Sequence, residues 1–116
     1  MTIPEPPSSP LQRGVVVPAS HVDRSRLIED LSLLADAGAD FVRIGLDWPW
    51  MQPSAGGLDG DAVEFYLGAA QHARALGIDL WLTLTDRDVP HWFDDEGGFG
   101  DERFALHWWP RWVEHC

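Results

Sequence analysis

The sequence predicts an α/β protein built on a parallel sheet. Three short runs of β-branched and apolar residues alternate with three helical patterns, in the order β-α-β-α-β-α. Two glycines that end the predicted helices, Gly38 and Gly77, stand 39 residues apart, about the length of one βα unit. Such alternation is typical of parallel strands joined by right-handed crossovers. The pattern alone fits an open doubly wound sheet as well as part of a barrel.

The first third of the chain predicts a lead, a strand and a helix. Residues 1–12 are rich in proline and serine, which predicts a flexible lead without regular structure. The run Gly14–Val17 predicts a buried strand. We expect Asp23 or Ser25 to cap a helix that ends at Gly38. The apolar positions of this helix share one face: Leu27, Ile28, Leu31, Leu34 and Ala35.

The remaining chain predicts two more strands and two more helices. Phe41–Leu46 is the second expected strand, ended by Trp48-Pro49, and Ile78–Thr85 is the third. The second helix is expected from Asp59 or Asp61 to Leu76, and the third over Glu102–Cys116, after a loop over 86–100. One stripe of the second helix is apolar: Val63, Tyr66, Leu67, Ala70 and Ala73. Trp108, Trp109 and Trp112 have the spacing of core residues in the third helix.

The composition argues against several classes of function. The formal charge is −11 and every basic residue is Arg, so we expect no nucleic-acid partner. No run is long and apolar enough to span a membrane, and no secretory signal opens the chain, so a cytoplasmic location is predicted. The five histidines lack metal-ligand spacing, and the single cysteine cannot form an intrachain disulfide. Neither a dinucleotide fingerprint nor a P-loop is present, so no metal and no cofactor are expected.

Several segments match one known family in order and spacing. They are Arg26–Leu31, Val42–Pro49, Asp88–Trp92 and Gly97–Phe99. Together they resemble glycoside hydrolase family 1, whose patterns include Arg-x-x-Glu-Asp, Arg-x-Ser-x-Ser-Trp-Pro and Gly-Gly-aromatic. The resemblance implies that residues 13–116 are the N-terminal part of a glycosidase domain, about the first three βα units of a (β/α)₈ TIM barrel. It also implies a retaining O-glycosidase that hydrolyses glycosides in carbohydrate metabolism.

Two alternatives to this interpretation remain open. Barrels of the β-galactosidase type share the Val-Arg-Ile-Gly strand, although the Gly-Gly-Phe element favours family 1. The second alternative is a non-catalytic fragment or pseudo-enzyme. Retaining glycosidases need two carboxylates about 5–5.5 Å apart, and the family carries them in Asn-Glu-Pro and Glu-Asn-Gly, whereas this sequence has no Asn. We therefore expect no catalytic residue and no hydrolysis by this chain alone. Its expected partners are a complementary barrel fragment or a second copy.

The second strand predicts a pair of supporting residues. Arg43, Gly45 and Asp47 share one parity and should face the barrel lumen, while Val42, Ile44 and Leu46 face the helices. A buried guanidinium needs a carboxylate partner, for which Asp47 or a residue of another chain is the candidate. The alternative is an arginine at a strand edge whose charge reaches water. The resemblance implies that Arg43 supports the nucleophilic Glu of the family from beneath.

The end of the third strand predicts substrate-binding residues. Asp86 and Arg87 replace the His and Trp with which the family grips the sugar nearest the cleavage point, at the strand end where barrel enzymes build their sites. Asp86 could accept hydrogen bonds from two hydroxyls, and Arg87 could meet an anionic group. A solvated charge cluster is the alternative. Trp48 and Trp92, at strand ends or in loops, are candidates for the wall of the site.

Overall fold

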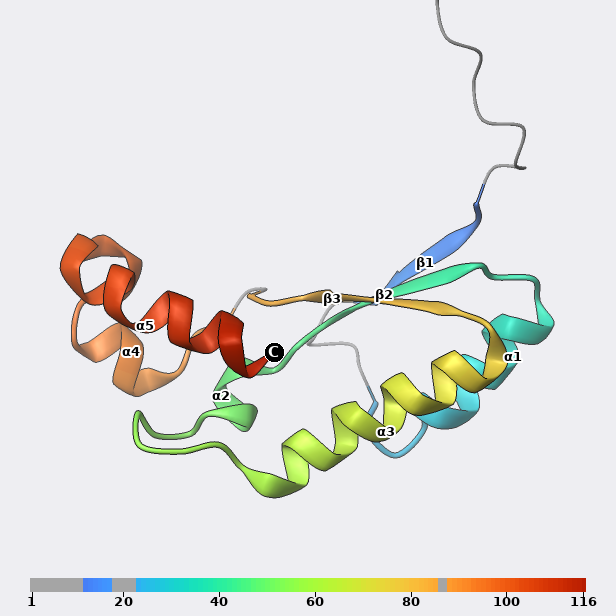
Figure 1. Cartoon of the computed structure of the whole chain (residues 1–116), viewed down its shortest axis with the longest axis horizontal. Helices are drawn as coiled ribbons and strands as arrows, with labels where there is room; N and C mark the ends of the chain where they lie inside the picture. The colour runs from blue at the N-terminus through green and yellow to red at the C-terminus, as the bar shows by residue number, and fades with distance from the viewer. Residues whose placement is uncertain (1–11, 18–22, 86–87) are drawn as a thin grey trace, which may run out of the picture.

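The computed structural model describes residues 12–17, 23–85 and 88–116 (Figure 1). Three parallel strands form one sheet in the order β1 (Gly14–Val17), β2 (Phe41–Gly45) and β3 (Asp79–Thr83). The crossover helices α1 (Leu27–Asp36) and α3 (Gly60–Leu76) lie on the same side of the sheet in Figure 1. The predicted α/β class with a parallel sheet is confirmed. The predicted lead, except Gln12, lies outside the described residues.

Three short helical segments stand where the sequence predicted strand ends and loops. They are α2 (Trp48–Met51), α4 (His91–Asp95) and the 3₁₀ turn η2 (Gly98–Gly100), followed by α5 (Glu102–His115). The Asp47 carboxylate caps α2 by accepting a hydrogen bond from the Trp50 N–H at 3.1 Å. Pro49 in the first turn lacks the N–H that a helix start leaves unused. Trp48-Pro49, which was predicted to end the strand, therefore begins a helix, and β2 already ends at Gly45.

The predicted caps of α3 and the predicted Gly38 stop of α1 (φ 91°) are confirmed, whereas the predicted N-cap of α1 is wrong. The Asp59 carboxylate accepts from the Ala62 N–H at 2.9 Å, and Gly77 ends α3 in the left-handed conformation at φ 75°. Arg26 stands at the N-cap of α1 and makes no side-chain cap. Asp23 instead accepts hydrogen bonds from the backbone N–H and the hydroxyl of Ser25, at 3.0 and 2.6 Å. The Asp23 side chain thus closes a turn ahead of the helix.

The alternation predicted for β2 is confirmed. Val42, Ile44 and Leu46 are buried beneath the helices. On the opposite face Val16, Arg43 and Trp81 stand in register across the three strands. Val16 is 54% exposed and Trp81 55%, and Arg43 is exposed as well. Within the described residues this face of the sheet is therefore largely open to solvent.

The buried row of α3 differs from the predicted stripe. The residues that α3 buries are Ala62, Tyr66, Ala69 and Ala73. Leu67, expected in the stripe, is 57% exposed, and Ala70 is exposed too. The buried row thus consists of three small alanines and one large residue, Tyr66. Because alanine contributes little to a hydrophobic pattern, the periodicity favoured the larger apolar residues over the alanines that are buried.

An aromatic cluster joins α5 to the carboxyl end of the sheet. Trp48 is fully buried at its centre and stacks on Trp112 with ring centroids 5.0 Å apart and planes 14° from parallel. Phe93 packs on the same ring at 4.8 Å. The Trp112 indole N–H donates to the Leu84 carbonyl at 2.7 Å. The predicted packing role of the α5 tryptophans is confirmed, because Trp112 is buried and Trp108 and Trp109 are partly buried against the core.

Candidate functional site

The carboxyl ends of the strands share one edge of the sheet, on the left in Figure 1. Asp47 follows β2 at this edge, and Leu84 continues from β3. The connection from β1 returns toward the sheet at Arg24, ahead of α1. Because parallel strands bring their carboxyl ends together, side chains from three separate connections meet here. In barrel enzymes this is the end that carries the active site.

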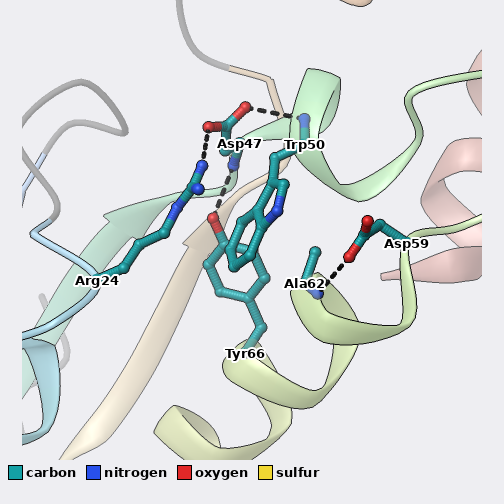
Figure 2. Close-up of polar contacts among 6 residues, drawn as sticks. All are labelled: Arg24, Asp47, Trp50, Asp59, Ala62 and Tyr66. Atoms are coloured by element: carbon teal, nitrogen blue, oxygen red, sulfur yellow. Dashed lines mark hydrogen bonds and ion pairs between the residues drawn. The ribbon is translucent and has the colours of Figure 1, made fainter.

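Asp47 is the centre of the polar contacts at this edge (Figure 2). One carboxylate oxygen accepts from the Arg24 guanidinium at 2.7 Å. The other accepts from the Trp50 N–H, and the backbone N–H of Asp47 donates to the Tyr66 hydroxyl at 2.9 Å. The side chains of Arg24 and Asp47 are 47% and 33% exposed. One aspartate thus ties the loop before α1, the start of α2 and helix α3 to the end of β2.

The Arg24 guanidinium is held on a second side by an aromatic ring. Its central carbon lies 3.5 Å from the centroid of the Trp50 ring, a cation–π geometry. The Trp50 ring is supported in turn by Phe65 at 5.4 Å and by Tyr66 at 5.8 Å between centroids. A carboxylate and a packed ring therefore fix the orientation of a charged side chain that is half exposed to solvent.

The groups fixed at this edge are suited to binding polar groups of a ligand. Burial raises the pKa of the Tyr66 hydroxyl above its usual value, so the phenol stays neutral at physiological pH. Asp59, also drawn in Figure 2, is occupied in capping α3. A fixed ion pair beside a neutral phenol can orient the hydroxyl groups of a ligand.

Of the two partners predicted for Arg43, Asp47 is excluded in this structure, and Arg43 reaches solvent as in the alternative interpretation. Asp47 pairs with Arg24, and four residues along a strand span about 13 Å, too far for an ion pair. Arg43 is exposed on the open face of the sheet, so its charge is hydrated without a carboxylate. Within the described ranges no carboxylate lies at ion-pair distance from it. Its role beneath a nucleophilic Glu stays a prediction.

The two tryptophans predicted to line the site are both tied to Gln52. The Trp48 indole N–H donates to the Gln52 side-chain oxygen at 3.0 Å, and the Trp92 indole N–H donates to its backbone oxygen at 2.8 Å. Trp48 is fully buried, whereas Trp92 is half-buried. Contact with a sugar stays a prediction for both, and the enclosed ring of Trp48 offers no free face in this arrangement.

The remaining predicted binding residues, Asp86 and Arg87, lie outside the described residues. Their neighbour Asp88 is described and is exposed. No cluster of three or more His, Cys, Asp or Glu side chains that could hold a metal occurs in residues 12–17, 23–85 and 88–116. No helix of these residues has the length and apolar character needed to cross a membrane. The cytoplasmic location stays a prediction.

Sequence reasoning missed Arg24, Trp50 and Gln52, and it counted Tyr66 only as a packing residue. A signal existed for Gln52, because a polar residue soon after Trp-Pro and ahead of a glycine-rich turn can satisfy indole N–H groups. No local pattern pointed to Arg24, since its partners come from residues 47 and 50. Such a pair is visible only once the connection after β1 and the end of β2 are brought together.

Comparison with known proteins identifies the family. The model of Glycosyl hydrolase family 1 matches residues 19–116. The chain belongs to this family. The non-cyanogenic β-glucosidase of Trifolium repens is 31% identical over 78 residues, which cover 64% of this chain and 16% of that protein. The raucaffricine-O-β-D-glucosidase of Rauvolfia serpentina is 32% identical over 81 residues, covering 66% of this chain and 15% of that protein.

Solved structures of the family share the fold. The β-glucosidase of Exiguobacterium antarcticum superposes with a TM-score of 0.75 at 29% identity, over 80% of this chain and 21% of that chain. The virulence factor SghA of Agrobacterium tumefaciens superposes with a TM-score of 0.73 at 26% identity, over 79% and 20% of the two chains. The chain thus spans about a sixth of these curated relatives and a fifth of these solved structures. The predicted partial TIM barrel is confirmed.

Proposed function

We propose that this chain supplies the first three βα units of a retaining O-glycosidase and does not hydrolyse glycosides by itself. The observation that carries the proposal is the match of 80% of the chain to 21% of a family 1 β-glucosidase, at a TM-score of 0.75. The relatives are named β-glucosidases, and SghA has been solved with its substrate analogue salicin. A β-glycoside is therefore the substrate class that we propose for the complete barrel.

The expected inactivity of the chain rests on its carboxylates. Retention requires an acid/base and a nucleophile about 5–5.5 Å apart. Asp47 is held by Arg24 and caps α2. Asp94, Asp95 and Glu96 are exposed and consecutive at the end of α4. The sequence has no Asn, so the Asn-Glu-Pro and Glu-Asn-Gly elements of the family have no counterpart in it.

Within a complete barrel, we assign substrate preference to Asp86 and Arg87. A charged pair there replaces the His-Trp pair of the family, so its hydrogen-bonding and electrostatic character differs from that of a glucosidase. Restoring Asp86→His with Arg87→Trp should raise activity on neutral glycosides relative to anionic ones. An unchanged ratio would make the pair a solvated loop cluster. We also assign Arg43 to the lumen of the complete barrel and Trp92 to the rim of its substrate site.

A chimeric enzyme tests the proposal. This chain would replace the matching N-terminal segment of the Exiguobacterium antarcticum β-glucosidase, and hydrolysis of p-nitrophenyl β-glucoside would be measured. The isolated chain should show only the buffer rate, the truncated glucosidase without the segment should be inactive, and the chimera should hydrolyse the glucoside. A well-folded chimera that remains inactive would favour the non-catalytic alternative. Turnover by the purified isolated chain, abolished by substituting one of its own carboxylates, would overturn the proposal.

A further inference from the structure

A second concave site lies away from the Asp47 cluster. It is an open hollow of about 480 Å³ where the loop after α2 meets α4 and the first half of α5. This volume falls within the range of about 300–1,000 Å³ that small-molecule sites occupy. Its lining residues come from both sides of the connection between α4 and α5: Ala55, Trp92, Asp95, Glu96, Phe104 and Trp108. We call this site the α4–α5 groove.

Three aromatic rings form the wall of the α4–α5 groove. The Trp92 and Trp108 centroids lie 5.0 Å apart with planes at 69°, and those of Phe104 and Trp108 lie 6.4 Å apart at 59°. All three residues are half-buried, so part of each ring remains accessible. Rings inclined so steeply form a corner in the wall of the groove, and the parts that line it are aromatic surface. This is the arrangement that attracts a cation.

The charged groups of the groove are all negative. Asp95 and Glu96 are exposed and consecutive, at the end of α4. The lining residues include no Arg, Lys or His. The Trp92 indole N–H is already donated to the Gln52 carbonyl at 2.8 Å and is not available to a ligand. The formal charge of −11 adds a long-range attraction for cations.

We propose that the α4–α5 groove binds a small organic cation, an alkylammonium compound. Its methyl or methylene groups would lie against the corner formed by Trp92, Trp108 and Phe104, and its charge would face Asp95 and Glu96. An anion would meet two carboxylates without a compensating base. A neutral sugar could stack on the rings, but it would gain nothing from the charge. The complementary partner of aromatic faces with two carboxylates is a cation with apolar substituents.

A titration with tetramethylammonium chloride tests this proposal on the full chain. The indole N–H signals of ¹⁵N-labelled protein would be followed by NMR and assigned with Trp92→Phe and Trp108→Phe. The Trp92 and Trp108 signals should shift saturably. Sodium chloride at equal ionic strength and tert-butanol, a neutral compound of similar shape, should leave them unshifted. Removing one indole should weaken binding about two- to fivefold, because each cation–π contact at an exposed site contributes modestly.

A matched pair of double variants separates a specific site from general charge attraction. Asp95→Asn with Glu96→Gln removes two exposed charges from the groove and should weaken binding about three- to tenfold. Asp61→Asn with Glu64→Gln removes the same charge from α3, where both residues are exposed, and should change the affinity less than twofold. Equal weakening by both pairs would overturn the proposal. Tighter saturable binding of methyl β-glucoside, or no saturable shift with tetramethylammonium, would overturn it as well.

Discussion

Replacing Trp112 by phenylalanine should weaken the packing of α5 against the end of β3. The indole is fully buried, stacks on Trp48 at 5.0 Å and donates to the Leu84 carbonyl at 2.7 Å. Phenylalanine keeps a stacked ring but leaves that carbonyl without its donor, a loss of about 1 kcal/mol. The smaller ring also leaves a void worth about 1 kcal/mol. The free energy of unfolding should therefore fall by about 2 kcal/mol.

Urea denaturation followed by circular dichroism at 222 nm measures this loss. With a denaturant slope of about 2 kcal/mol/M, the midpoint for Trp112→Phe should fall by about 1 M. Trp109→Phe is the matched control, since Trp109 packs on Trp48 at 5.9 Å but is only partly buried. Its midpoint should fall by less than half as much. Equal shifts in the two variants would refute the role given to the Trp112–Leu84 hydrogen bond.

Three further predictions concern a charge, a pair of glycines and the single tyrosine. Asp47→Asn keeps a capping oxygen for α2 but breaks the half-exposed pair with Arg24, so the free energy of unfolding should fall by about 0.5 kcal/mol. This loss should be smaller in 1 M salt, which screens the pair. A loss that salt leaves unchanged would contradict this. Gly77→Ala should destabilise the chain by about 1 kcal/mol, because the backbone at this residue has a φ of 75°. Gly68→Ala lies inside α3 with open space around its Cβ, so it should stabilise the chain by about 0.5 kcal/mol in the same urea assay. Stability changes of the same sign in the two variants would contradict the conformations assigned. Burial raises the pKa of Tyr66 in the folded chain, so the unfolded chain releases this proton first and the stability contributed by the neutral phenol is lost as pH rises above about 10. Absorbance at 295 nm should place the pKa of this sole tyrosine higher in buffer than in urea, and identical values would contradict its burial.

Much of the fold could be predicted because the relevant signals are local. The Asp59 cap, the Gly77 stop and the alternation along β2 each depend on one residue or a two-residue period. The N-cap prediction for α1 failed because Asp23 and Ser25 hydrogen-bond to each other ahead of the helix. A side chain that can cap a helix can equally close a turn, and the sequence does not distinguish the two.

The site was harder to predict because its contacts are non-local. Asp47 was identified from its place after β2, but its partner was assigned along the same strand rather than across to Arg24. Trp48 was assigned to a site wall because it ends a strand. Its neighbours Phe93 and Trp112 enclose it from segments about 45 and 64 residues away, and no periodicity reports such contacts. A sequence pattern can assign such a residue to a strand end or a helix, but it does not identify the distant residues that it contacts.

Sedimentation velocity of the isolated chain over a range of concentrations tests the central claim most directly. The described sheet has three strands of a barrel, with both of its edges unpaired and Val16 and Trp81 open on one face. Open edges and exposed apolar faces favour association. We predict a sedimentation coefficient that rises with concentration, and a smaller rise for Trp81→Gln. A single monomeric boundary at every concentration would contradict the account and indicate a self-sufficient open α/β domain.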